Sequence, residues 1–228
     1  MNAIRRAAAA IAQPSVAALL GSAIVLNLVG GEAVKLARLP IYGDSVGTML
    51  VGMLCGPLVG AVGGALSNVV LGLRDPAMPY FAPVSVVIGA LAGLAVRAGL
   101  VRAWRGDDVR RAPLRALGGP VVAGLVTGVA AAVVATPIAT YVFGGLTGGP
   151  TDILVGVFRA FGADLWKSVL GQSVVSDPVD KTATALLALA IASALPRRAV
   201  ARFPQGERLL GAPAAGPGAA EAVDALDR

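Results

Sequence analysis

Long apolar stretches alternate along the chain with short segments that hold most of the polar residues. The longest uncharged stretch covers 29 residues, from Ser45 to Leu73, and only the Gly56-Pro57 pair interrupts it. A helix needs about 20 apolar residues to cross a hydrocarbon core of roughly 30 Å. Proline removes a backbone donor and glycine permits a left-handed turn, so the pair ends one helix and begins another. The pattern predicts a helical hairpin.

The second arm of this hairpin has a small or polar residue at every fourth position, along one side of a helix: Gly56, Gly60, Gly64, Asn68 and Gly72. Small residues at this spacing let two helix backbones approach closely inside a membrane. Asn68 interrupts the glycine stripe. An amide without a partner in hydrocarbon costs about 2 to 7 kcal/mol, so Asn68 either links two helices or contacts a ligand.

The remaining stretches predict four further spans and one interfacial helix or hairpin. Val16 to Val34 is the first span, and the hairpin arms are the second and third. The other predicted elements are a fourth span from Tyr80 or Pro83 to Leu100, a fifth from Leu117 to Gly144 with a kink at Pro137, and a sixth that Asp177-Pro178 opens and that ends at Leu195. Between the last two, apolar residues at intervals of three and four from Pro150 to Ser176 predict an amphipathic interfacial helix or hairpin, broken at Gly162.

Composition agrees with an integral membrane protein, because 56% of the 228 residues are hydrophobic and only 14% are charged. The absence of histidine and the single Cys55 exclude histidine-based catalysis, an intrachain disulfide and a cysteine metal cluster. We expect no cofactor and no metal. The formal charge of +6 comes from arginines beside apolar runs, which favours a role in membrane orientation over nucleic-acid binding.

The arginines predict the topology. Six spans with a cytoplasmic N-terminus place the arginines of residues 5–6, 97–115 and 197–208 on the cytoplasmic side, whereas five spans would move the central group outside. The predicted fold is therefore an all-α, polytopic membrane protein with six transmembrane helices and both termini in the cytoplasm. Residues 1–14 form a cytoplasmic segment, 15–200 the six-helix membrane domain, and 201–228 a disordered cytoplasmic tail.

This topology brings polar and aromatic residues of several segments toward the outer face. We expect them to line a wet, aromatic-walled pocket that is open to the outside. The candidate ligand contacts are Tyr42, Asp44, Asn68, Arg74, Tyr80, Phe81, Tyr141, Trp166, Asp180 and Lys181. Structural alternatives exist: Tyr80, Phe81 and Trp166 suit an interfacial aromatic belt, and Asp177 with Asp180 suits a cap and a first-turn acid of the sixth helix.

Three blocks carry a resemblance to a known family: IYGDSVGTMLVGMLCGPLVGAVGGALSNVVLGL, FAPVSVVIGALAGL and SDPVDKTATALLALAIASALPRR. From about residue 16 to 200 the chain resembles the substrate-capture subunits (S components) of energy-coupling factor (ECF) transporters, and most closely the riboflavin-type group. The GP-x-x-G hairpin with its trailing Asn and the late D-K-T are the motifs involved.

This resemblance implies a subunit that captures a vitamin-like micronutrient at the cell membrane of a prokaryote and is not itself an enzyme. It also implies docking on a transmembrane coupling subunit that works with two ATPase subunits, and the chain has no G-x-x-x-x-G-K-[ST] loop of its own. Comparable positions of the docking face on the first helix are Ala17, Ala18, Gly21 and Ser22, with Gly and Ser in place of alanines.

Two other classes stay open from the residues alone. An autonomous secondary carrier would carry inverted repeats with broken helices near the midplane, and the sequence has no convincing repeat. A carboxylate-dependent lipid enzyme would need acids clustered at helical spacing to hold a metal. The acids on the predicted outer face lie in separate segments instead: Asp44, Asp152, Asp164, Asp177 and Asp180.

Overall fold

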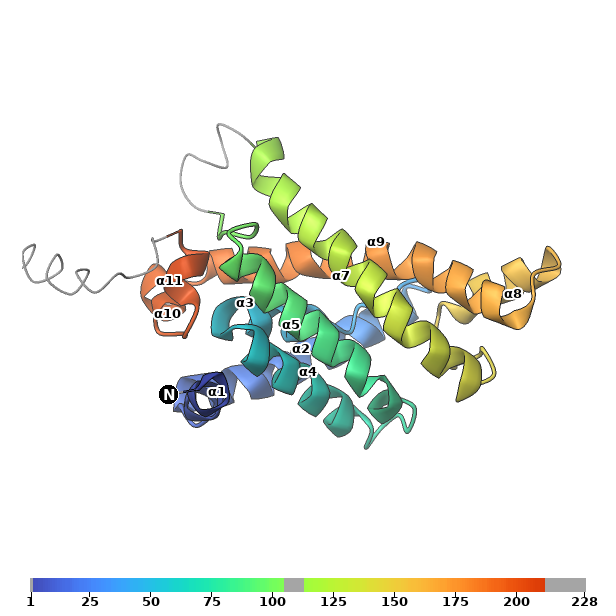
Figure 1. Cartoon of the computed structure of the whole chain (residues 1–228), viewed down its shortest axis with the longest axis horizontal. Helices are drawn as coiled ribbons and strands as arrows, with labels where there is room; N and C mark the ends of the chain where they lie inside the picture. Colours follow the sequence, from blue (N-terminus) through green and yellow to red (C-terminus); the bar gives the residue numbers. More distant parts are fainter. Residues whose placement is uncertain (1, 105–112, 212–228) are drawn as a thin grey trace, which may run out of the picture.

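The computed structural model describes residues 2–104 and 113–211, without the side chains of residues 113–115. Within these ranges the chain forms helices and connecting loops, and the predicted all-α class is confirmed (Figure 1). The elements are α1 (Ala3–Ile11), α2 (Pro14–Leu36), α3 (Val46–Cys55), α4 (Pro57–Leu71), η1 (Met78–Phe81), α5 (Ala82–Arg97), α7 (Pro113–Tyr141), α8 (Asp152–Ala160), α9 (Leu165–Ala194), α10 (Arg197–Ala201) and α11 (Gly206–Leu209).

Three helical segments are long and apolar enough to cross a membrane, and they belong to the first, fourth and fifth predicted spans: Pro14–Leu36, Met78–Arg97 and Ala116–Tyr141. Helix α9 has 30 residues but carries Lys167, Asp177, Asp180 and Lys181. By length and composition, these three segments could cross a membrane.

The Gly56-Pro57 hairpin is present as predicted. Gly56 has a φ of 95°, which favours glycine, and Pro57 begins α4. All ten residues of α3 are buried, so α3 is the central helix of the bundle. At 1.5 Å per residue α3 is only about 15 Å long, which is about half of a hydrocarbon core of roughly 30 Å.

The glycine stripe of α4 packs against α5 as its spacing predicts. A Cβ atom added to Gly60 would lie 2.4 Å from the carbonyl oxygen of Gly89, and one added to Gly64 would lie 2.3 Å from that of Ser85. Both distances are shorter than any real contact of a Cβ atom. The two backbones are thus in direct contact, and larger side chains would separate the helices.

The prediction that Asp177-Pro178 opens the last helix is wrong. Helix α9 begins after Asp164, whose side chain accepts a hydrogen bond from the backbone N–H of Lys167, and continues through Pro178 to Ala194. Neither Asp177 nor Asp180 is therefore a helix cap. Packing explains the continuity, because a Cβ atom on Gly128 of α7 would lie 2.4 Å from Cα of Pro178. Helix α7 likewise continues through Pro120 and Pro137 and ends at Tyr141.

Residues 204–211 are folded, in contrast to the predicted disordered tail. The Gln205 backbone N–H donates to the Leu54 carbonyl oxygen (2.8 Å), and its side chain donates to that of Gly93 (2.9 Å) and accepts from Arg97 Nε (3.1 Å). Gln205 thereby satisfies a carbonyl group at the end of α3 and ties this end of α3 to α5. Residues 212–228 lie outside the described residues, as do Arg105, Arg110, Arg111 and the side chain of Arg115 from the predicted basic loop.

Helix ends gather at two opposite ends of the bundle. The hairpin turn, the C-terminal end of α5 and residues 196–211 meet at one end, near α1 (Figure 1, left). Helix α8 and the N-terminal end of α9 lie at the other end, on the right of the same view.

Candidate functional site

A cavity of about 360 Å³ lies at the end of the bundle opposite the hairpin turn. Its wall combines parts of α2, α4, α5, α7 and α9 with the loops before α3, α5 and α8. Ligand sites span roughly 300 to 1,000 Å³, so this cavity suits a small molecule. Six of the ten residues predicted as ligand contacts line it: Tyr42, Asp44, Asn68, Arg74, Phe81 and Lys181.

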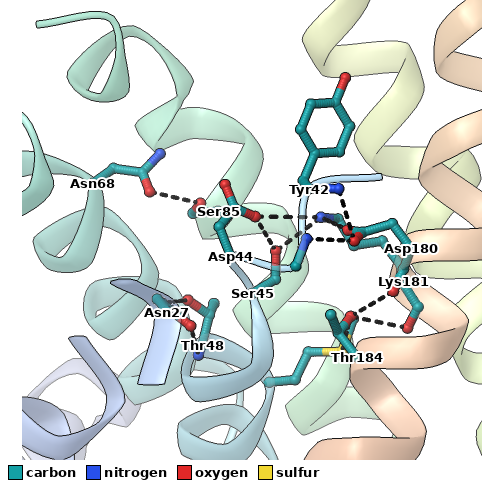
Figure 2. A network of polar contacts seen from close by, with 12 residues as sticks. Asn27, Tyr42, Asp44, Ser45, Thr48, Asn68, Ser85, Asp180, Lys181 and Thr184 are labelled. Carbon is teal, nitrogen blue, oxygen red and sulfur yellow. Dashed lines mark hydrogen bonds and ion pairs between the residues drawn. The ribbon is translucent and has the colours of Figure 1, made fainter. Parts of the chain in front are cut away.

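The loop at Tyr42–Ser45 is held in the wall by Asp180. Asp180 Oδ1 accepts hydrogen bonds from the backbone N–H groups of Tyr42 (3.1 Å) and Gly43 (2.7 Å), as Figure 2 shows. Gly43 has a φ of 69°, and its carbonyl oxygen lies so close to α2 that a Cβ atom on Gly30 would be 2.2 Å away. Asp180 is fully buried and does not line the cavity. It is a positioning residue for the loop.

Lys181 links this loop to α9 through a buried charge cluster. Its Nζ contacts the Asp180 carboxylate, donates to Ser45 Oγ (2.8 Å) and lies 3.8 Å from Asp44 Oδ1. The same ammonium lies 5.4 Å from the centre of the Tyr42 ring. An ion this deeply buried is tolerated only when paired and hydrogen-bonded, and Lys181 meets both conditions.

Asn27 links neighbouring helices, which is one of the two roles that the sequence allows for Asn68. Its side chain is fully buried between helices and makes four hydrogen bonds. Asn27 Oδ1 accepts from the backbone N–H groups of Gly47 (2.7 Å) and Thr48 (3.3 Å), and Nδ2 donates to Thr48 Oγ1 (2.9 Å) and Ser67 Oγ (2.8 Å). Figure 2 shows Asn27 beside Thr48. Asn27 therefore caps α3 from α2 and links both to α4.

Asn68 is bonded only on one side. Its Oδ1 accepts a hydrogen bond from Ser85 Oγ of α5 (3.2 Å), whereas its Nδ2 has no partner among the residues that the structure describes. In Figure 2 this nitrogen points away from Ser85. Because Asn68 lines the cavity, its N–H groups are available to an acceptor on a bound molecule.

A second polar group surrounds the Tyr42 hydroxyl. Gln172 Nε2 (3.0 Å) and Thr151 Oγ1 (3.2 Å) both donate to Tyr42 Oη. Burial raises the pKa of the Tyr42 phenol above its ordinary value, so the phenol stays protonated at neutral pH. Asp177 also lines the cavity, and its Oδ2 is buried with no hydrogen-bond partner in the described parts of the chain.

Ion pairs at the rim are more exposed. Glu32 Oε1 lies 3.9 Å from Lys35 Nζ and 3.6 Å from Arg74 Nη2, and all three side chains are at least 40% accessible to solvent. Solvent screens such pairs, so they contribute little to stability. Their charges still shape the electrostatic field at the mouth of the cavity.

The aromatic residues divide into two groups. Phe81 lines the cavity and stacks on Phe143, with ring centres 5.5 Å apart. Tyr80, Tyr141 and Trp166 do not line it: Tyr80 packs edge-on against Phe143, and Tyr141 packs against Trp166 at 5.6 Å. These three side chains are 39% to 79% exposed, an arrangement that suits an interfacial belt.

Several lining residues were missed by the sequence analysis, notably Asn27, Gln172 and Asp177 as contacts. One signal could have found Asn27, since it is an amide inside the uncharged first span, where a polar group needs a partner. Gln172 and Asp177 gave no such signal. Their place in the wall depends on α9 continuing through Pro178.

The four predicted docking residues lie together on one side of α2. Ala17, Ala18, Gly21 and Ser22 are all exposed. A Cβ atom added to Gly21 would meet nothing within 4 Å. This face of α2 is not covered by the described parts of the chain.

No group of three or more His, Cys, Asp or Glu side chains within the described ranges could hold a metal ion. Comparison of the chain with protein-family models, curated proteins and solved structures gives no match. The function proposed below therefore depends on the cavity, the membrane character of the fold and the sequence blocks quoted above.

Proposed function

We propose that this chain is a membrane-embedded capture protein of the ECF S-component type, which binds a small vitamin-like molecule in the cavity for uptake into the cell. The observation that carries the proposal is a cavity of about 360 Å³ inside the helical bundle, lined by apolar residues together with several polar and charged side chains. Polar groups inside a membrane protein are expensive and mark binding sites or pathways. Asn68 Nδ2 and Asp177 Oδ2 are polar atoms without a hydrogen-bond partner in the described structure.

The distribution of charge supports an outward-facing cavity. The arginines of residues 97–102 and 197–208 belong to the end of the bundle that holds the hairpin turn, away from the cavity. Under the positive-inside rule this end faces the cytoplasm. In our proposal the chain crosses six times with both termini inside.

The exposed side of α2 supports the proposed partner. Ala17, Ala18, Gly21 and Ser22 give it a surface on which another helix backbone can approach closely. We propose that this side of α2 docks on a transmembrane coupling subunit, and that ATP hydrolysis is done by two further subunits. The capture protein itself then needs no catalytic residues and no cofactor.

The test combines ligand identification with a docking variant. The chain is purified from a host grown in rich medium, and mass spectrometry identifies the small molecule that stays bound. Gly21→Leu should then lower uptake of that compound at least tenfold while the isolated subunit binds it with unchanged affinity, because Gly21 does not line the cavity and has open space around it. The matched control is Val25→Leu, also exposed on α2 but bulky already. Loss of binding in Gly21→Leu, or purification of an empty protein that binds no small molecule, would contradict the proposal.

A further inference from the structure

The charge cluster around Lys181 contains more carboxyl groups than its one ammonium group can neutralise. Asp44, Asp177 and Asp180 all lie close enough to Lys181 to interact electrostatically with it. One ammonium thus faces three carboxyl groups. Asp180 is the best paired of the three, because it also accepts two backbone N–H groups, and Asp44 accepts a hydrogen bond from Ser45 Oγ (2.9 Å).

Asp177 is the least well paired of these three carboxyl groups. It is 2% exposed, and its Oδ2 has no hydrogen-bond partner among the described residues. A buried carboxylate oxygen without a partner destabilises the protein. Asp177 also has no helix-capping role that would offset this cost, because it lies in the interior of α9. Asp177 lines the cavity, which has room for a ligand group that pairs with it.

The opposite part of the wall has complementary chemistry. Asn68 presents an unpartnered N–H donor, and Phe81 presents an aromatic ring that Phe143 holds in place by stacking. A bound molecule is therefore offered a carboxylate acceptor, an amide donor and an aromatic surface. Flat nitrogen heterocycles with an amino group or a positive charge satisfy all three.

We propose that Asp177 is the anionic ligand contact, and that the substrate is a cationic or amino-substituted nitrogen heterocycle whose N–H or positively charged group pairs with the Asp177 carboxylate. This inference rests on the proposed function and names the substrate class for the same cavity. Neutral flavins and anionic carboxylic acids fall outside that class, because neither neutralises the excess negative charge.

The first measurement uses the ligand-free protein and two isosteric variants. Asp177→Asn replaces a buried carboxylate whose Oδ2 has no hydrogen-bond partner among the described residues, so the melting temperature in detergent should stay equal or rise. Asp180→Asn is the matched control three residues away, and it should lower the melting temperature, since its carboxylate pairs with Lys181 and holds the Tyr42–Ser45 loop. Equal destabilisation by both variants would show that Asp177 is a structural residue and would overturn the inference.

The second measurement is isothermal titration with three probes: thiamin as a cationic amino-heterocycle, riboflavin as a neutral one and biotin as an anion. We expect thiamin to bind the wild type and Asp177→Asn to weaken it about 10- to 150-fold, the range for a hydrogen bond to a charged group. Binding of riboflavin or biotin alone, or thiamin binding that Asp177→Asn leaves unchanged, would overturn the inference while the proposed function stands. If the wild type binds none of the three probes, the inference fails, and the proposed function fails with it only if no small molecule co-purifies with the protein.

Discussion

Two asparagines on neighbouring helices provide a direct test of which polar residues hold this bundle together. Asn27 is fully buried with four hydrogen bonds, whereas Asn68 makes one. We predict that Asn27→Ala destabilises the protein strongly and that Asn68→Ala does so weakly. The main effect of Asn68→Ala should instead be weaker ligand binding.

The magnitude follows from the contacts. Hydrogen bonds between helices of membrane proteins average about 0.6 kcal/mol each, so four are worth about 2.4 kcal/mol. Asn27→Ala also leaves the backbone N–H groups of Gly47 and Thr48 buried at the first turn of α3, which brings the expected loss to about 3 to 4 kcal/mol. Asn68→Ala should cost about 0.6 kcal/mol, because only the bond to Ser85 is lost.

Unfolding by titration with SDS in mixed micelles measures both free energies, and isothermal titration with the co-purified compound measures affinity. Asn68→Ala should weaken binding about ten- to hundredfold, since an acceptor on the ligand would be left unpaired. Asn27→Ala serves for the stability measurement alone, because Asn27 also lines the cavity. If Asn68→Ala destabilises as much as Asn27→Ala and leaves affinity unchanged, Asn68 only links helices and the proposed site loses its amide donor.

Two further predictions concern packing and topology. Gly60→Ala should lower the free energy of unfolding by about 1 to 3 kcal/mol through overpacking against α5. The control Gly21→Ala has open space around it and should change the free energy of unfolding by less than about 0.5 kcal/mol. Equal effects of the two variants in SDS titration would contradict the close contact of α4 with α5. In a Cys55→Ala background, a membrane-impermeant maleimide applied to intact cells should label Ala77→Cys at the cavity end and should spare Arg102→Cys, whereas the reverse pattern would refute the proposed orientation.

The hairpin could be predicted from the sequence because its causes are local. Gly56 and Pro57 determine the break through their own backbone chemistry, and the four-residue spacing of glycines determines which side of α4 can approach another helix. The identity of that neighbour could not be predicted. Gly89 and Ser85 of α5 complete the contact, and small residues on several other helices would have served equally well.

Part of the candidate site could be predicted as well. Six of the ten proposed contacts line the cavity, and they come from segments whose polar residues interrupt apolar stretches near one predicted face. Tyr80, Tyr141 and Trp166 were wrongly grouped with the cavity wall, since the sequence locates an aromatic residue near the end of a span but not the side of the helix on which it packs.

The roles of the buried polar residues were decided only by tertiary structure. Asp177-Pro178 has the local signature of a helix start, yet close packing against Gly128 of α7 accompanies an uninterrupted α9 and places Asp177 in the cavity wall. Asn27 and Asn68 are the same residue type in similarly apolar helices. Asn27 makes four hydrogen bonds, whereas Asn68 makes one and its Nδ2 has no partner among the described residues. Periodicity along a chain defines which face of a helix is apolar. The partners of a polar group on that face are supplied by residues distant in sequence, and only the packed helices bring them within hydrogen-bond distance.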